Sequence, residues 1–197
     1  TRTWSLVGGH TLDPIKWNHT AQNAVQQVIN VIEGYRMGPI SALAKDPVQN
    51  SKDASQQELV RVEYRLVKRK AKTGGTCYLL TVTDTGTSGL QGPILRADEI
   101  QERNSMLNEG EDWAAFEAQG FTKTGARDLG SRGQGKNAFL YFSKPPVLEG
   151  DLRIILYDTL LEDGEYRFGA RRATNIWDGA MYPPRLGDDA RNVISNG

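Results

Sequence analysis

Cysteine is almost absent from this chain of 197 residues, since Cys77 is the only one. A single cysteine excludes a disulfide framework within the chain and any metal site built from several cysteines. Charge of one sign is also missing, because 24 basic residues balance 24 acidic ones, so the global charge favours neither nucleic acid nor a membrane surface as a partner. No apolar run reaches membrane-spanning length, and the N-terminus lacks the pattern of a signal peptide. We therefore expect a reduced, cytoplasmic protein without a membrane segment.

The length of the chain fits a single domain with a sizeable core. We expect this core over about residues 14–172, and the tail at 178–197 stays unassigned. Residues 90–129 are rich in charges and glycines and are typical of a mobile insertion. Because the chain starts at Thr1 and stops at Gly197 without natural ends, we expect it to be one domain of a longer protein.

Hydrophobic periodicity divides the chain into expected helices and strands. The expected helices cover 14–33, 39–45, a short stretch at 113–118, and 136–143. One expected strand starts at Glu58, and three further strands are expected at 77–84, 152–157 and 166–172. Residues 46–57 are polar and are predicted to form a loop. Glu162-Asp163-Gly164 is a hairpin signal between the last two strands.

Asp84 stands at the end of an expected strand, shares a face with Leu80 and Val82, and is followed closely by Gly86. Burial of an unpaired carboxylate is costly, so a carboxylate in line with core residues calls for a partner. It can accept a hydrogen bond from an adenine amino group, and the glycine lets the base approach the backbone. A hydrogen bond to a charged group contributes roughly 1.5–3 kcal/mol. The alternative interpretation is an ordinary Asp-Thr-Gly turn.

Three glycines, Gly130, Gly133 and Gly135, precede the expected helix that begins at Lys136. Such a loop can direct backbone N–H groups at one anion, and the following helix adds its positive end. Lys136 and Arg132 can each add a cation. The alternative interpretation is a flexible loop in front of a helix.

A Walker A loop is a rival interpretation of the same glycines, because Gly130 and Gly135-Lys136 have nearly the required spacing. Residues 152–158 would then imitate a Walker B strand. Against this, Asn137 stands where a Mg²⁺-binding Ser or Thr belongs, and the segment before Gly130 is polar where a buried strand is required.

Together and in this order, the two motifs resemble those of the GHKL group of gyrase-type topoisomerases, heat-shock chaperones of the ninety-kilodalton class, histidine kinases and MutL-type repair proteins. The family's adenine motif is Asp-x-Gly-x-Gly, and this chain has Asp84-Thr85-Gly86-Thr87-Ser88-Gly89, with the second glycine displaced by one. The phosphate motif, Gly-x-x-Gly-x-Gly, is matched at Gly130, Gly133 and Gly135. Thr122-Lys123-Thr124-Gly125 resembles the family's lid cluster. The resemblance covers about residues 14–172.

The resemblance implies a Bergerat fold, which is an α+β two-layer sandwich with a mixed, mostly antiparallel sheet and a mobile ATP lid, here at 90–129. It implies Mg²⁺-dependent ATP binding, with slow hydrolysis that serves as a conformational or dimerisation switch. The implied partner is a second copy or a following domain, and nucleic acid would be involved only indirectly. The residues implied to contact the nucleotide are Asp84, Gly86, Gly89, Thr124, Gly130, Arg132, Gly133, Gln134, Gly135 and Lys136.

The family's third motif is a helix before the adenine strand that carries Glu and, four residues later, Asn. The Asn holds Mg²⁺ and the Glu activates the attacking water. Two registers are open here: Asn23 lies four residues after His19, and Asn30 lies four residues after Gln26. Asn23 is preferred because Ala24 follows it, as in the family.

Neither register supplies the Glu, so the base is in question. Glutamine cannot take a proton from water, whereas histidine can, near its reference pKa of about 6.5. His19 and Glu33 are therefore the candidate bases, and Asn23 and Asn30 are the candidate Mg²⁺ ligands. The missing Glu keeps open a non-catalytic nucleotide-sensing module. A histidine kinase catalytic domain is a further alternative, although such a domain needs a partner histidine domain that this chain lacks.

Overall fold

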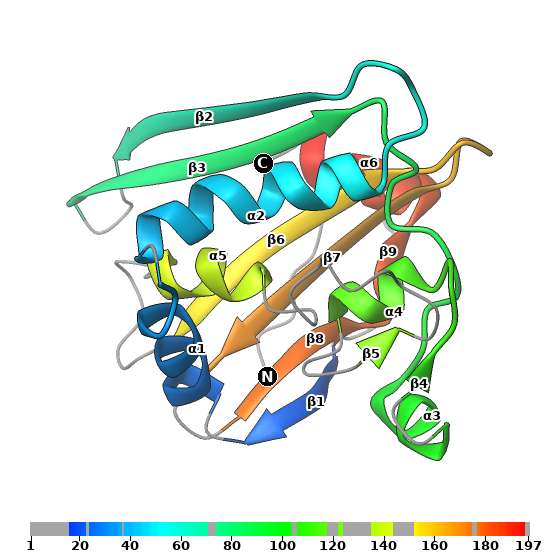
Figure 1. The fold of residues 1–197 in the computed structure, drawn as a ribbon, viewed down its shortest axis with the longest axis horizontal. Coiled ribbons are helices and arrows are strands. Elements are labelled where there is room, and N and C mark those ends of the chain that lie inside the picture. The colour runs from blue at the N-terminus through cyan, green and yellow to red at the C-terminus, as the bar shows by residue number, and fades with distance from the viewer. Residues whose placement is uncertain are drawn as a thin grey trace.

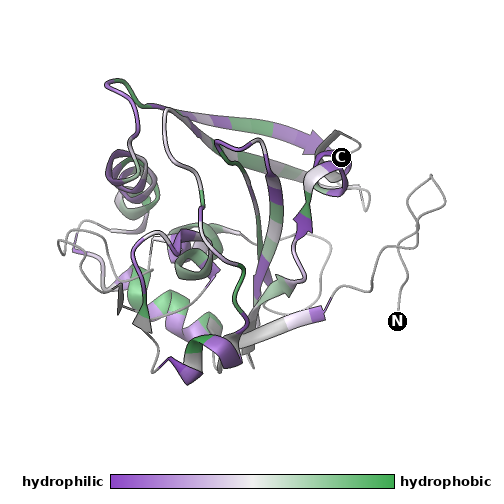
Figure 2. Cartoon of the chain, turned by 90° about the vertical axis from the view of Figure 1, so that its right-hand side faces the viewer, coloured by the Kyte–Doolittle hydropathy of each residue, from purple (hydrophilic) through white to green (hydrophobic). Residues whose placement is uncertain are grey.

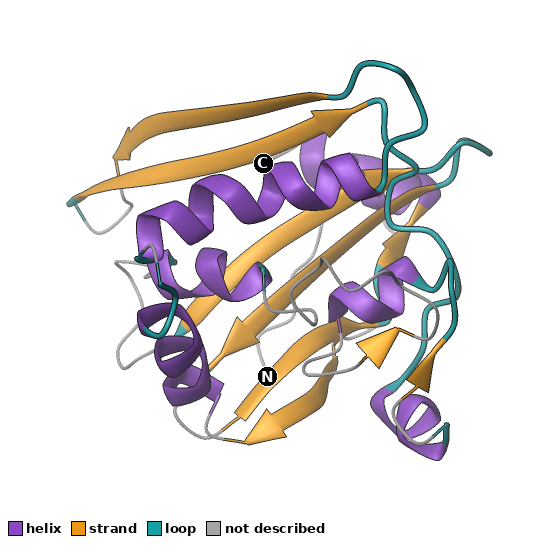
Figure 3. Cartoon of the chain, in the orientation of Figure 1, coloured by secondary structure: helices purple, strands orange, loops and turns teal. Residues whose placement is uncertain are grey.

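The computed structural model describes residues 16–22, 24–36, 38–70, 74–103, 106–117, 122–123, 135–143, 152–174 and 177–195. Helices pack on antiparallel sheets in these residues, so the predicted α+β class is confirmed (Figures 1 and 3). None of the helices in this described part combines the length and the apolar character that crossing a bilayer requires.

The largest sheet has the strand order β1-β8-β7-β6, and β9 pairs with β7. Its strands are β1 (Lys16–Gln22), β6 (Arg153–Leu160), β7 (Tyr166–Ala173), β8 (Trp177–Tyr182) and β9 (Arg185–Leu186). All of its pairings are antiparallel. β6 and β7 form the predicted hairpin, with Leu161 and Glu165 bonded through their backbones around the turn.

A second, two-stranded sheet consists of β2 (Arg61–Lys70) and β3 (Thr76–Thr85). In its register Tyr64 lies opposite Val82, and Val62 lies opposite Asp84. The Tyr64 hydroxyl donates to the Ala44 carbonyl at 2.8 Å, so this face of the hairpin looks toward helix α2. Asp84 shares this face with Val82, as the predicted alternation of β3 requires.

Three helices cover one side of the main sheet: α1 (Ala24–Glu33), α2 (Pro39–Asp53) and α5 (Lys136–Phe142) (Figures 1 and 2). Val25 and Val28 of α1 pack with Leu140 of α5 and Ala173 of β7 in one buried cluster. A neighbouring cluster joins Ile32, Ala42 and Ala138. These contacts fix α5, and with it the residue before it, against α1 and α2.

The predicted helix at 14–33 is wrong over 16–22, where the chain forms β1 instead. The buried helical spacing begins only at Val25, and the earlier residues gain backbone hydrogen bonds by pairing with β8. Tertiary pairing therefore overrides the weak local preference. The tail left unassigned from residue 178 contains most of β8, then β9 and α6 (Gly187–Ser195), which packs on β7.

The predicted loop at 46–57 is also wrong over 46–53, because α2 continues to Asp53. The polar character of the stretch suggested a loop. Most of the polar residues instead form the solvent side of the helix, and Pro47 is accommodated inside it in a buried position.

Residues 90–117 form a packed subregion with its own small core, which joins Leu95, Ile100, Leu107 and Ala114. Its elements are α3 (Ala97–Glu102), β4 (Met106–Leu107) and α4 (Asp112–Glu117), and β4 pairs in parallel with β5 (Thr122–Lys123). The short helix predicted at 113–118 is confirmed as α4. That this region closes over a nucleotide remains a prediction.

Candidate functional site

The carboxylate of Asp84 meets helix α2 at Ser51. The Ser51 hydroxyl lies 2.7 Å from Oδ2 of Asp84 and 2.8 Å from the Pro47 carbonyl. Since the hydroxyl has one proton, it donates to one of these acceptors at a time. A carboxylate has about four lone-pair positions, so Asp84 keeps acceptor capacity for a ligand. Ser51 is buried, whereas Asp84 is exposed at the end of β3.

The residues after Asp84 are fastened to the end of α2. The Gln56 amide donates to the Gly86 carbonyl at 3.0 Å, and the Ser88 amide donates to the Ala54 carbonyl at 2.9 Å. Gly86 has φ +86°, and a Cβ there would lie 2.7 Å from the Leu59 carbonyl oxygen. The backbone itself therefore requires glycine at this position, independently of any approaching base.

Gly135, the last glycine of the phosphate motif, lies beside the same helix. Gly135 is buried, and a Cβ built on it would lie 3.2 Å from Cβ of Asp46 and 3.3 Å from Nδ2 of Asn50. The Asp46 carboxylate also accepts a hydrogen bond from the Tyr35 hydroxyl at 3.0 Å. Burial raises the pKa of Asp46, and the Tyr35 hydrogen bond partly offsets this effect.

Helix α2 thus carries the partners of both sequence motifs. Asp46 and Asn50 are four residues apart and lie on one helix face, about 6 Å apart along the axis. Ser51 is the next residue and reaches Asp84. One helix therefore links the strand end at Asp84 to the glycine at 135.

Asp46, Asn50 and Ser51 were missed by the sequence reasoning, because the stretch was interpreted as a polar loop. A signal was present. Asp46 is followed four residues later by Asn50, on the helix that directly precedes the hairpin carrying Asp84. This is the spacing of the family's third motif, with Asp in place of Glu.

Lys136, predicted to contact phosphate, is buried at the start of α5. Its Nζ donates to the carbonyl of Phe116 and lies 5.9 Å from the centre of the Phe116 ring. In this structure the ammonium is therefore directed toward the end of α4.

The residues predicted for metal binding and catalysis that the structure describes lie on β1 and α1. His19 belongs to β1, opposite Gly179, so no helical turn relates it to Asn23. Asn30 accepts a hydrogen bond from Gln26 at 2.7 Å on the exposed side of α1. Glu33 lies 3.4 Å from the Tyr141 hydroxyl at the exposed end of that helix. Their predicted roles stay predictions.

Several predicted residues lie outside the described part of the chain. They are Asn23, Thr124, Gly130, Arg132, Gly133 and Gln134.

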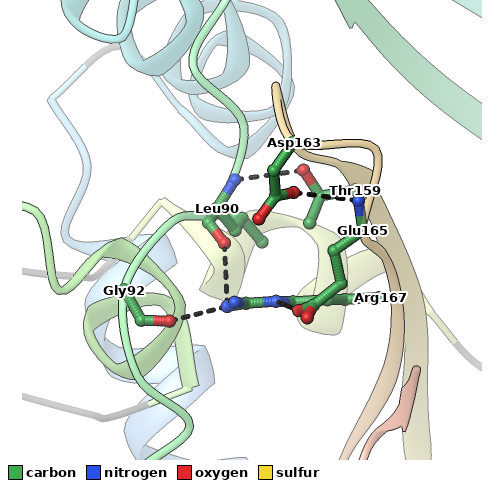
Figure 4. Close-up of polar contacts among 6 residues, drawn as sticks. All are labelled: Leu90, Gly92, Thr159, Asp163, Glu165 and Arg167. Carbon is green, nitrogen blue, oxygen red and sulfur yellow. Dashed lines mark hydrogen bonds and ion pairs between the residues drawn. The ribbon is translucent and has the colours of Figure 1, made fainter. Parts of the chain in front are cut away.

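The segment after the Asp84 motif is anchored to the main sheet, as Figure 4 shows. The Leu90 amide donates to Oγ1 of Thr159 at 3.1 Å, and Arg167 donates to the Gly92 carbonyl at 2.7 Å. Gly89, predicted to contact nucleotide, has φ +71°, and a Cβ there would lie 2.5 Å from the Thr159 hydroxyl oxygen. The hairpin of β6 and β7 thus fixes where this segment runs.

Within the described residues no group of three His, Cys, Asp or Glu side chains is placed to hold a metal ion. A metal bound near Asp46 and Asn50 would take most of its ligands from elsewhere. Comparison of the chain with protein-family models, with curated proteins and with solved structures yielded no match.

Proposed function

We propose that this domain binds ATP with Mg²⁺ in the GHKL manner and hydrolyses it slowly. The observation that carries the proposal is that one residue of each motif lies beside α2: Ser51 contacts Asp84, and Gly135 lies so near Asp46 and Asn50 that a Cβ on it would crowd both. A ligand shared by the two sequence signals would explain why segments more than forty residues apart meet on one helix.

Asp84 is the proposed adenine reader. Its carboxylate accepts the exocyclic amino group, while Ser51 holds the carboxylate in place from the opposite element. The backbone N–H groups around Gly130, Gly133 and Gly135 are proposed to receive the phosphates, since successive glycines let amides converge on an anion.

Asn50 is the proposed Mg²⁺ ligand, in place of Asn23 or Asn30. Asp46 is the proposed catalytic base, in place of His19 or Glu33. Asn50 supplies an amide oxygen suited to Mg²⁺. This ion usually keeps several waters and substrate phosphates as its other ligands, so it needs few donors from the protein. When bound, the ion would neutralise phosphate charge. Asp46, half-buried and with a raised pKa, is the proposed base for the attacking water.

Isothermal calorimetry with ATP and Mg²⁺ tests the binding step. The variant Asp84→Asn turns one acceptor oxygen into an NH₂ donor facing the adenine amino group, so we expect a loss of about 2 kcal/mol or more, at least thirtyfold in affinity. Asp189→Asn, an exposed carboxylate on α6, is the matched control and should bind as wild type. Equal affinity for the two variants would remove Asp84 from the site.

Phosphate release under saturating Mg-ATP tests the hydrolytic step. Asp46→Asn should retain ATP binding and lose the rate by about 10²–10⁴-fold, the usual contribution of a general base. Aspartate is one methylene shorter than the family's Glu, which is the reason to expect slow turnover. A wild-type rate no faster than that of Asp46→Asn would favour the alternative, a nucleotide-sensing module without catalysis. In either case the bound nucleotide is proposed to act as a switch toward a second copy or a following domain.

A further inference from the structure

Four ionisable side chains from four elements are buried in one cluster, which includes Lys136, the residue after Gly135. Glu117 ends α4, Tyr157 belongs to β6, Arg171 belongs to β7, and Lys136 opens α5. None of them is more than 9% exposed. Glu, Lys and Arg are almost never buried this far unless they are paired, so the cluster needs a reason.

The end of α4 is held by contacts with β6 and with α5. The Tyr157 hydroxyl donates to Oε1 of Glu117 at 2.7 Å. Lys136 donates to the carbonyl of Phe116, the preceding residue. The Phe116 ring also meets the Tyr157 ring edge-on, with 4.7 Å between their centres. The last two residues of α4 are thereby tied to both β6 and α5.

The sheet makes room for this arrangement. Tyr157 lies directly opposite Gly169 in the pairing of β6 with β7. A Cβ on Gly169 would lie 2.6 Å from Cζ of the Tyr157 ring. Only glycine at 169 therefore lets the ring cross the neighbouring strand and reach Glu117.

Building on the ATP-binding function proposed above, we propose that Lys136 is a positioning residue, whose buried hydrogen bond to the Phe116 carbonyl, next to Glu117, holds Gly135 in place for phosphate binding. Gly135 immediately precedes Lys136 and packs within van der Waals reach of Asp46 and Asn50. Releasing Lys136 from α4 would let α5 shift, and Gly135 would move relative to α2. Lys136 holds the Phe116 carbonyl and Tyr157 holds Glu117, so both contacts contribute to where the end of α4 lies relative to α5.

The charge state of Glu117 then influences nucleotide affinity. The groups that face it are Tyr157 from β6, Lys136 from α5 and Arg171 from β7. Burial raises the pKa of Glu117 to about 7, opposed by the Tyr157 hydrogen bond and by the charges of Arg171 and Lys136. Acidification below neutral pH therefore removes the negative charge that faces Lys136, and we expect weaker ATP binding.

Calorimetric titration of the full chain with Mg-ATP, at pH 8 and pH 6, tests the proposal. Lys136→Met and Glu117→Gln should each weaken binding at pH 8 by about tenfold, the size of effect that supporting residues around a site produce. The double variant should be no weaker than the single ones, because both changes release the same end of α4. Lys52→Met, which removes an exposed lysine from α2, should bind as wild type.

The same titrations separate positioning from direct phosphate contact. Positioning predicts that Glu117→Gln removes most of the difference between wild-type affinity at pH 8 and at pH 6. If Lys136→Met weakens ATP binding while Glu117→Gln behaves as wild type at both pH values, Lys136 contacts the phosphates and the inference is overturned. If Lys136→Met does not fold, as judged by circular dichroism, the pH comparison with Glu117→Gln decides alone. If the wild-type chain binds no ATP at either pH, the proposed function itself is overturned. If the wild-type chain binds ATP and the variants bind it equally well, only the positioning role of Lys136 is overturned.

Discussion

Glu117 predicts a pH dependence of stability that requires no ligand. Its carboxyl has a pKa near 7 in the folded chain against 4.5 as the reference, chiefly because burial disfavours the charged form. Between these values the folded state binds a proton that the unfolded state has lost. Stability therefore falls as pH rises through this window. With 1.36 kcal/mol for each pKa unit, the loss from pH 5 to pH 8 is about 2–3 kcal/mol.

Urea denaturation of wild type and Glu117→Gln at pH 5 and pH 8 measures this contribution. Glutamine keeps the shape of the side chain and cannot ionise, so the stability of wild type relative to the variant should fall by about 2–3 kcal/mol between the two pH values. Other titrating groups are common to both proteins and cancel in this difference. Glu109→Gln, on an exposed turn, should show no such trend. A relative stability that is constant or rises with pH would refute the reasoning.

Three further predictions concern the site and its supports. Ser51→Ala removes the hydroxyl that holds Asp84, so calorimetry should show ATP binding weakened by about 1 kcal/mol, roughly fivefold; unchanged affinity would deny that Ser51 orients Asp84. Gly92 and Gly110 have nearly the same φ, +84° and +83°, but a Cβ on Gly92 would lie 2.7 Å from the Glu111 backbone whereas Gly110 faces open space. In urea denaturation Gly92→Ala should therefore cost about 1–3 kcal/mol more than Gly110→Ala, and equal costs would contradict the packing described. The raised pKa of Asp46 predicts that ATP hydrolysis is lost on acidification at a higher pH than for an ordinary aspartate, because the base must be ionised; a pH–rate profile that is flat through this region would exclude it.

The sequence predicted the strands of the two hairpins well because each carries its own signal. Alternation placed Val82 and Asp84 on one face, and the turn residues Glu162-Asp163-Gly164 marked the other hairpin. Helix α5 was equally clear from its apolar residues between a glycine and a proline-rich stretch. These elements are specified locally, so a local pattern was enough.

The failures share a physical cause, which is that partners far along the chain decide the outcome. Residues 16–22 form a strand because β8 offers them hydrogen bonds, and β8 lies more than 150 residues away. Helix α2 continues past Pro47 because its polar side chains meet the Asp84 segment and Gly135. Those contacts also contain Asp46 and Asn50, so the misassigned loop and the missed site residues have the same origin.

The buried cluster around Glu117 was beyond the reach of pattern reasoning as well. Lys136 follows a glycine loop and looks like a phosphate ligand in the sequence, yet its ammonium reaches the end of α4. No local pattern indicates that Tyr157 crosses over Gly169 to meet Glu117.

A crystal structure of the chain with Mg²⁺ and a non-hydrolysable ATP analogue tests the central claim most directly. The account predicts the adenine amino group within hydrogen-bonding distance of the Asp84 carboxylate and the phosphates beside Gly135, with Asp46 and Asn50 of α2 facing them. A base bound away from Asp84, or phosphates held away from Gly135, would contradict it.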